Sequence, residues 1–348
     1  MITIKQNILS LIIFLSLFGC IDPSSEDLWS ISIDTNLETN SFARNVTVVQ
    51  DTAFIAAGQS GIQVWNLKDQ YLINDFQEYW VPGGTNPDNF NDLSLIEVDT
   101  LNKLIFVSET NQNVMIFSYQ QDDTLIYFND ILSSRTRDLI SFPSDSGSFV
   151  MYAADNDDGM KWSIFTFYDD CAFGFPCYKP SFPAINAAEI STPGSPQGID
   201  SDGNNYVVMA VDQLGVELFS IDSLGAFPSF VGRVDTEGNA EKVTLMTDGV
   251  YVACDDAGAA FIPIESFSSD NIIYRFGEDL TVDHIAIKGN IASLTLGSKG
   301  IALYDVSDPT NPEEKGIFPV GYSYRSVFWG DKLLVCTREG LQVITIEQ

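Results

Sequence analysis

The chain has 348 residues and is strongly acidic, with 17 Lys and Arg against 48 Asp and Glu and a formal net charge of −31. Because such a surface repels phosphate backbones, we do not expect a nucleic-acid partner. A single histidine, and five cysteines without a CxxC pair, argue against histidine triads and zinc sites, so we expect neither a metal nor another cofactor.

The first 19 residues have the pattern of a signal peptide. Lys5 supplies a positive charge, and the apolar segment after it is shorter than the roughly 20 residues of a membrane-spanning helix. The segment ends in Leu17-Phe18-Gly19-Cys20, which resembles the bacterial lipobox, although Phe18 is bulkier than that pattern has. The resemblance implies cleavage before Cys20 and lipid on Cys20, with residues 20–27 as lipidated cysteine and polar tether. Simple secretion and an uncleaved anchor stay open as alternatives.

Beyond the tether, a short pattern returns along the chain. It begins with Gly and places apolar side chains at the first, third, fourth and sixth following positions, as in GIALYDV from Gly300. Five copies keep the glycine and start at Gly61, Gly215, Gly258, Gly300 and Gly340. Two copies without the glycine start at Asn113 and Lys161. Successive starts lie 40 to 54 residues apart, close to the length of a four-stranded propeller blade.

Each copy has three further strand-like runs around it, such as RNVTVV and TAFIAAG before the first copy and YLINDFQ after it. The seventh unit ends at Gln348 after its third strand, but Leu28 to Thr35 alternates like a strand and precedes the first unit. We therefore predict an all-β fold over residues 28–348. It is a seven-bladed β-propeller of four-stranded antiparallel blades, closed by the N-terminal strand pairing into the last blade.

The sixth copy continues as Ile301-Ala302-Leu303-Tyr304-Asp305-Val306-Ser307-Asp308-Pro309. This resembles the LVIVD repeat of bacterial propeller proteins, whose signature runs Leu-Val-Ile-Val-Asp-Val-Ser-Asp-Pro. Other copies keep less of the Asp-Pro tail, and the units between Asp92 and Pro183 are longer. The resemblance extends from about Ala43 to the end of the chain. It implies a scaffold on secreted and surface proteins.

The cysteines other than Cys20 fall into two pairs. Cys171 and Cys177 flank a loop with Gly and Pro, which in an exported protein predicts a local disulfide, with two buried thiols as the alternative. Cys254 and Cys336 lie in blades five and seven, which are not neighbours, so we expect both to be free and buried. Two acidic loops, residues 155–159 and 200–204, do not fit the calcium-loop pattern and are interpreted as turns.

The innermost strand of each blade begins at one face of a propeller, so the residues there surround the mouth of the central channel. Nine candidate binding residues are aligned at this place: Arg44, Asn45, Asp92, Arg137, Asp138, Lys242, Asp283, His284 and Arg325. The concentration of basic groups predicts a site for a polar or anionic group, or for a charged side chain of a partner. The alternative is that opposite charges of neighbouring blades pair and fix the packing.

Together these patterns predict a lipid-anchored, monomeric propeller at the outer membrane of a Gram-negative bacterium, on the periplasmic side or at the cell surface. The lipid binds the membrane, and the propeller acts as a non-catalytic binding or scaffolding module for protein or glycan partners. The alternative is a lactonase, hydrolase or lyase that uses carboxylates and a bound divalent ion at the channel mouth, and we therefore assign no catalytic residue.

Overall fold

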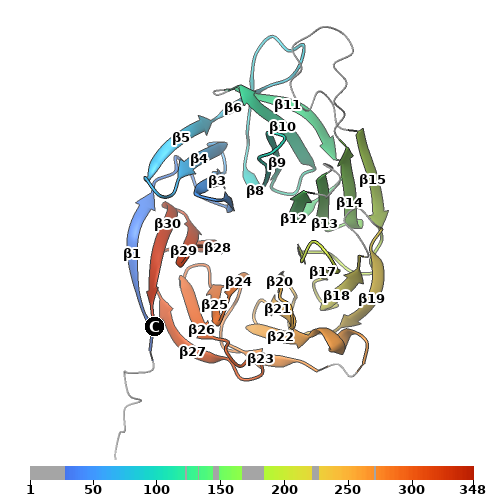
Figure 1. The fold of residues 1–348 in the computed structure, drawn as a ribbon, viewed down its shortest axis with the longest axis vertical. Coiled ribbons are helices and arrows are strands. Elements are labelled where there is room, and N and C mark those ends of the chain that lie inside the picture. The colour runs from blue at the N-terminus through green and yellow to red at the C-terminus, as the bar shows by residue number, and fades with distance from the viewer. Residues whose placement is uncertain are drawn as a thin grey trace, which may run out of the picture.

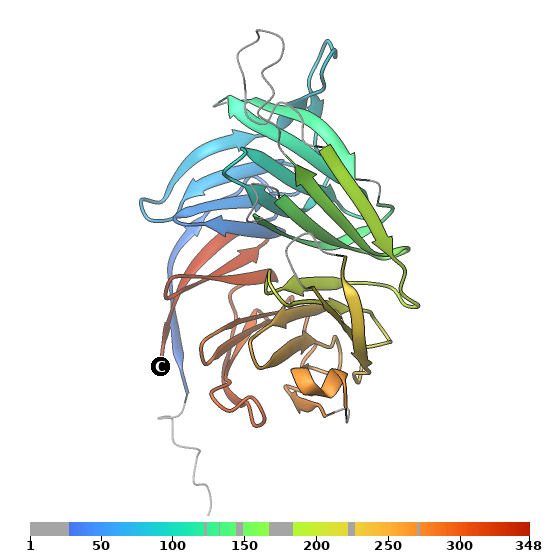
Figure 2. The same cartoon turned by 45° about the vertical axis from the view of Figure 1, so that its right-hand side comes forward.

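The computed structural model describes residues 28–121, 124–131, 133–143, 149–166, 184–221, 227–269 and 272–348. Their strands form seven sheets, arranged as blades around a central axis (Figure 1, Figure 2). The predicted seven-bladed propeller is thus confirmed. Cys20, Cys171 and Cys177 lie outside the described residues. Within the described part of the chain, no helix has the length and apolar character needed to cross a membrane.

Each blade runs from an innermost strand A to an outermost strand D. Blade one holds β2 (Asn45–Val49), β3 (Thr52–Ala56), β4 (Ile62–Asn66) and β5 (Tyr71–Phe76). Blade two holds β8 (Leu93–Asp99), β9 (Leu104–Glu109), β10 (Val114–Gln121) and β11 (Thr124–Ile131). Blade three holds β12 (Thr136–Pro143), β13 (Phe149–Asp155), β14 (Gly159–Thr166) and β15 (Ala184–Ile190).

The other four blades repeat this order. Blade four holds β16 (Gly198–Ser201), β17 (Tyr206–Ala210), β18 (Val216–Ser220) and β19 (Ser229–Val234). Blade five holds β20 (Lys242–Leu245), β21 (Gly249–Ala253), β22 (Ala259–Pro263), the short 3-10 helix η2 (Ile264–Phe267) and β23 (Tyr274–Phe276). Blade six holds β24 (His284–Lys288), β25 (Ile291–Thr295), β26 (Ile301–Asp305) and β27 (Glu313–Phe318). Blade seven holds β28 (Ser323–Trp329), β29 (Lys332–Thr337), β30 (Gly340–Glu347) and the N-terminal β1 (Ser30–Leu37).

The ring closes where β1 pairs antiparallel with β30, from Ser30 opposite Glu347 to Leu37 opposite Leu341 (Figure 1). The predicted closure is therefore confirmed, with the strand two residues further along than the sequence indicated. Asp34 sits at a break in this register, where its carboxylate accepts hydrogen bonds from Lys332 Nζ at 2.8 Å and Thr345 Oγ1 at 2.7 Å.

Blade two is wider than the others. Two short strands, β6 (Glu78–Trp80) and β7 (Asp88–Asn89), extend its sheet beyond β11, and β6 pairs with β11 in the parallel direction. Tyr79 of β6 packs its ring against Phe117, with centroids 4.9 Å apart. The insertion thus covers the outer edge of the blade with an additional aromatic contact.

The glycine of the repeated pattern stands where strand D ends beside the start of strand C. Gly300 has φ +86°, and a Cβ atom there would lie 2.1 Å from the carbonyl oxygen of Phe318. A Cβ atom at Gly159 would clash in the same way, since it would lie 2.3 Å from the carbonyl oxygen of Ile190. Gly159 is therefore the pattern glycine of blade three, and the sequence alignment that placed Lys161 there was wrong by two residues.

Apolar side chains fill the spaces between the blades. Among the described residues, seven buried clusters lie one between each pair of adjacent blades, and the last joins blade seven to blade one. Each sheet is consequently buried on both faces. This explains why the B strands are continuous apolar runs rather than alternating ones, as in the fully buried β13.

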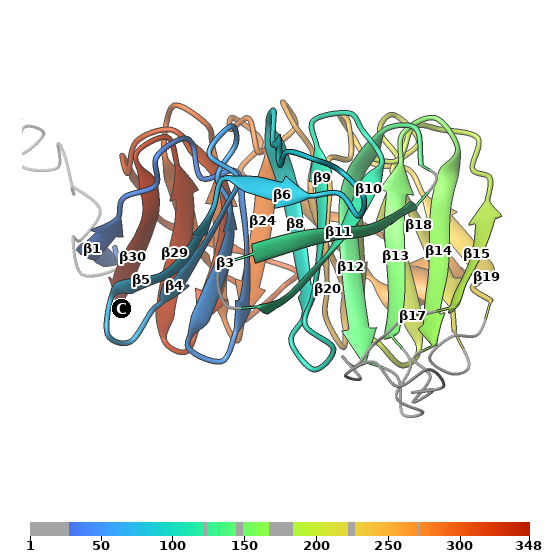
Figure 3. The ribbon, with the colours of Figure 1, turned by 90° about the horizontal axis from the view of Figure 1, so that it is seen from above.

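Strands A and C run from one face of the ring to the other, and strands B and D return (Figure 3). The face with the starts of strands A and the B–C turns is called the mouth face. The opposite face carries the A–B and C–D turns. Because β1 is a strand D, it starts at the opposite face, where Ser30 lies beside Glu347, and ends at the mouth face.

Candidate functional site: the channel mouth

Seven residues, one from each strand A, occupy equivalent places at the mouth. In blade one, Asn45 pairs with Ala56, and Ala56 pairs with Ile62, the residue after the pattern glycine. The same pairing defines one residue in every blade. We call this set the mouth ring: Asn45, Leu95, Asp138, Gly198, Lys242, His284 and Arg325.

The structure brings the predicted mouth residues together. A cavity of about 230 Å³ is lined by seven of the nine, namely Arg44, Asn45, Arg137, Lys242, Asp283, His284 and Arg325. Asp138 is buried beside them, as the partner of two of their cations. Asp92 was wrongly aligned, since the strand pairing of blade two places Leu95, three residues further along, in the ring. Asp92 instead lies beside the mouth, where its carboxylate is 3.5 Å from Arg44 Nη2.

Asp138 is the charged centre of the mouth ring. Its Oδ1 lies 3.2 Å from Arg325 Nη1, and its Oδ2 lies 3.3 Å from Lys242 Nζ. The pairs join blade three to blades seven and five, so they cross the channel or skip a blade. Among the described residues of the mouth, only Arg44 and Asp92 form the neighbouring-blade pair that the packing interpretation expects. Three of the four mouth cations are therefore paired, two of them in a manner that couples distant blades.

Gly198 explains how Lys242 reaches past blade four. A Cβ atom at Gly198 would lie 2.8 Å from the Cα and 3.3 Å from the Cδ of Lys242, so a side chain there would displace the lysine. In its absence Lys242 Nζ donates to the carbonyl oxygens of Gln197, at 2.5 Å, and Arg137, at 2.8 Å. Burial lowers the pKa of Lys242, although Asp138 counteracts that effect.

Several polar groups at the mouth lack partners. The structure gives no hydrogen-bond partner to the buried Nε atoms of Arg44, Arg137 and Arg325 or to Nδ1 of His284. His284 is 7% exposed, and burial, together with the charges of Arg325 and Lys242, lowers its pKa well below the usual value. The imidazole is therefore neutral at pH 7, and it can accept or donate one hydrogen bond at the mouth.

A second ring of side chains lies two residues further along each strand A, on the same side of the strand. It contains two acidic residues, Glu97 and Asp200, which line a deeper cavity of about 390 Å³. Burial raises the pKa of Glu97 to about 7 and that of Asp200 to about 6. Asp200 accepts a hydrogen bond from the backbone of Leu245 at 2.7 Å, and Glu97 accepts one from Ser141 at 3.1 Å. Our sequence analysis missed this ring.

An aromatic and arginine cluster forms part of the rim. The guanidinium of Arg44 lies 4.8 Å from the ring centre of Tyr324, and that of Arg338 lies 4.1 Å from the ring centre of Tyr322. Phe42 contacts both guanidinium groups, at 5.5 and 5.6 Å. Cation–π contacts of this kind hold two exposed or half-exposed arginines in place beside the mouth.

The acidic loops have the geometry of turns. Asp155 accepts hydrogen bonds from the backbone N–H groups of Ser134 and Asp157, and Asp202 accepts them from Asn204, Asn205 and Tyr206. In the ranges that the structure covers, no three or more His, Cys, Asp or Glu side chains are grouped to hold a metal ion. Cys254 and Cys336 are free and buried, as predicted.

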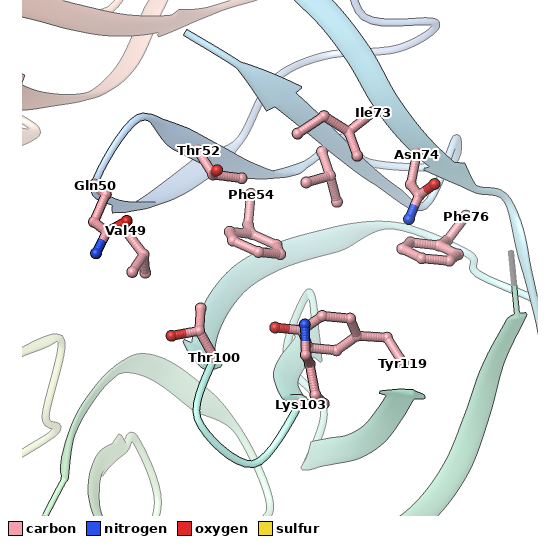
Figure 4. A pocket seen from close by; sticks show the side chains of 11 residues that line it. Val49, Gln50, Thr52, Phe54, Ile73, Asn74, Phe76, Thr100, Lys103 and Tyr119 are labelled. Atoms are coloured by element: carbon pink, nitrogen blue, oxygen red, sulfur yellow. The ribbon is translucent and has the colours of Figure 1, made fainter. Parts of the chain in front are cut away.

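Another cavity, of about 400 Å³, lies between blades one and two on the side of the A–B turns (Figure 4). Its lining is mostly neutral and includes Phe54, Phe76 and Tyr119. Lys103 Nζ lies 5.3 Å from the ring centre of Tyr119, and burial raises the pKa of this tyrosine to about 12. The hydroxyl group is therefore neutral at pH 7.

Comparisons with known proteins place the fold but not the activity. No family profile and no curated protein gives a significant match to this chain. The solved structure of U3-55K superposes with a TM-score of 0.65 at 12% identity, covering 91% of this chain and 98% of that one. The RRP9 WD40 repeats give 0.65 at 11%, covering 91% and 97%. The β-propeller domain of Cps50 (Swd1) from Myceliophteria thermophila gives 0.65 at 8%, covering 91% and 99%. At these identities the likeness shows a propeller fold alone.

Proposed function

We propose that this chain is a lipid-anchored propeller of the LVIVD-repeat kind, held at the outer membrane or the surface of a Gram-negative bacterium. It acts there as a non-catalytic binding module for a protein or glycan partner. One observation carries the binding role: the single carboxylate of the mouth ring, Asp138, is occupied by Lys242 and Arg325. A carboxylate held by two cations serves poorly as a general base or a metal ligand.

The course of the N-terminal strand supports this proposal. The tether, residues 20–27, joins the propeller just before β1, and β1 starts at the face opposite the mouth. Trp29 is fixed there, since its backbone N–H donates to the carbonyl oxygen of Lys315 at 3.0 Å. The described chain therefore enters the propeller at the face opposite the mouth, and an anchor that precedes it leaves the mouth face free for a partner.

Protease shaving of intact cells, combined with membrane fractionation and mass analysis of the N-terminus, tests the anchor. Wild type is expected to carry an acylated Cys20 in the membrane fraction, and Cys20→Ala is expected to be lost from that fraction. Loss of protein on shaving indicates the cell surface, and resistance indicates the periplasmic side. An unmodified soluble wild type would refute the anchor.

Photocrosslinking in the same cells tests the binding role. A photoreactive amino acid replaces Tyr322 at the rim of the mouth, or Lys68, which is exposed on a C–D turn of the opposite face. A discrete adduct from position 322 and none from position 68 is expected. Equal adducts from both positions, or none from position 322, would contradict a partner on the mouth face.

A further inference from the structure

We infer that the mouth binds the carboxylate of an acidic side chain presented by a peptide segment of the partner. This inference rests on the proposed binding function, and it specifies the chemistry of that site. Its basis is the balance of charges at the mouth, the unpaired groups in the cavity and the state of the aromatic rings at the rim.

The charges at the mouth are balanced, unlike those of the rest of the chain. Four cations line the cavity, namely Arg44, Arg137, Lys242 and Arg325. Near them lie four carboxylates, Asp92, Asp138, Asp283 and Glu241. In a chain with 48 acidic and 17 basic residues, such parity is a local concentration of basic groups. An anion is thus repelled less at the mouth than at most other places.

Arg137 is the cation left over. Asp138 pairs with Lys242 and Arg325, and Asp92 pairs with Arg44, whereas Arg137 has no ion pair among the described residues. Its Nε is buried without a hydrogen-bond partner. Glu241 attracts this guanidinium without forming an ion pair with it, so the Nε donor stays unsatisfied. A carboxylate satisfies such a guanidinium with two parallel hydrogen bonds.

His284 faces the same cavity and is more than nine-tenths buried, with Nδ1 unpartnered. Its neutral ring can donate a hydrogen bond to a carboxylate oxygen without adding charge. The cavity of about 230 Å³ admits a short acidic side chain but not an extended chain. A carboxylate at the end of a side chain therefore fits the mouth in both size and chemistry.

The state of the rim favours a peptide over an acidic glycan. Sugars bind to free aromatic faces, but Phe42, Tyr322 and Tyr324 already stack on the guanidinium groups of Arg44 and Arg338. Tyr322 and Tyr324 also contact each other, with ring centres 4.9 Å apart. The rim thus offers arginine N–H groups, which suit further acidic side chains of a peptide.

The single histidine makes the test direct, because the imidazole signals of a ¹⁵N-histidine-labelled chain report on His284 alone. The full mature chain is titrated with acetyl-Ala-Ala-Glu-Ala-Ala-amide and with its glutamine counterpart. A saturable shift of the imidazole signals is expected with the glutamate peptide, and at least tenfold weaker binding with the glutamine peptide. Arg137→Gln, which leaves no partner unpaired, is expected to weaken binding about tenfold. Lys68→Gln removes one positive charge from the opposite face and is expected to leave binding unchanged.

Four results would overturn the inference: no saturable shift, equal binding of both peptides, equal weakening by Lys68→Gln and Arg137→Gln, or binding of glucuronate but not of the glutamate peptide. Photocrosslinking at position 322 separates this failure from that of the proposed function. An adduct in cells without peptide binding in vitro leaves the partner on the mouth face and refutes only the carboxylate. Peptide binding without an adduct refutes the partner.

Discussion

Arg325 and Asp138 lie 187 positions apart in the chain, on strands A of blades seven and three, yet their side chains meet across the channel at 3.2 Å. The contact exists only when the ring is closed. With the pair between Asp138 and Lys242, it links three blades that do not touch one another through their sheets. The mouth therefore contributes to the stability of the whole ring.

Asp138→Asn is expected to lower the free energy of unfolding by about 3 kcal/mol, because the half-buried Lys242 and Arg325 lose the buried carboxylate that they share. Asp92→Asn is the matched control. Its pair with Arg44 is partly exposed, and a loss below about 1 kcal/mol is expected. Urea unfolding at pH 7 measures both, and equal losses would show that the pairs of Asp138 stabilise the fold no more than the exposed pair does.

Glu97→Gln is expected to remove part of the pH dependence of stability. Burial raises the pKa of Glu97 to about 7, so the folded state holds this proton more tightly than the unfolded chain does. The unfolding free energy then falls as the pH rises from about 4.5 to about 7. The variant is expected to exceed wild type by about 3 kcal/mol at pH 8 and to match it at pH 4.

Urea unfolding across this pH range is the measurement, with Glu78→Gln on the exposed strand β6 as control. The difference between variant and wild type isolates Glu97 from His284, whose lowered pKa acts in the opposite direction between the folded value and about 6.5. A difference that does not change with pH would show that folding does not raise the pKa of Glu97.

Gly300→Ala is expected to cost several kcal/mol, because the new Cβ would stand 2.1 Å from a backbone oxygen of the neighbouring strand. Gly289→Ala provides the comparison. It also has a positive φ, of +57°, but nothing lies within 4 Å of its Cβ position, and a cost of about 1 kcal/mol is expected. Thermal unfolding of both variants is the measurement. A larger loss for Gly300→Ala shows that the close contact requires glycine, and equal losses show that the positive φ alone requires it.

Cys254 and Cys336 are expected to resist alkylation in the native protein. Burial raises the pKa of both thiols to about 12, and the thiolate is the reactive form. Iodoacetamide treatment of native and unfolded protein, followed by peptide mass analysis, measures each site. The same maps test the predicted disulfide, since Cys171 and Cys177 would then be labelled only after reduction.

The fold could be predicted because each blade repeats one spacing of apolar residues. The pattern failed locally in blade three, where counting from Gly159 puts the polar but buried Ser163 in an apolar column. Starting the copy at Lys161 instead placed apolar residues at all four positions, but it shifted the predicted strand by two residues. In blade two, the alignment placed Asp92 three residues before Leu95, the residue that the strand pairing puts in the mouth ring.

The candidate site could be predicted only in part. Residues at the start of strand A could be identified by alignment, and most of them do meet at the mouth. The second ring could have been predicted, because Glu97 and Asp200 follow the mouth ring at the two-residue period of a strand. No sequence pattern predicts the ion pairs of Asp138, because they depend on the distance across a closed ring and on the missing side chain at Gly198.

The antiparallel pairing of β1 with β30 has a mechanical consequence in the anchored protein that we propose. A membrane tether pulls on β1 from the opposite face, whereas a bound partner pulls on the mouth face, so the tension runs along the strands of blade seven. Hydrogen bonds between antiparallel strands are perpendicular to the strands, and a pull along the strand stretches them all together. The seven residue pairs from Ser30 to Leu37 then resist sliding together, so that β1 stays paired with β30 and the ring stays closed under tension.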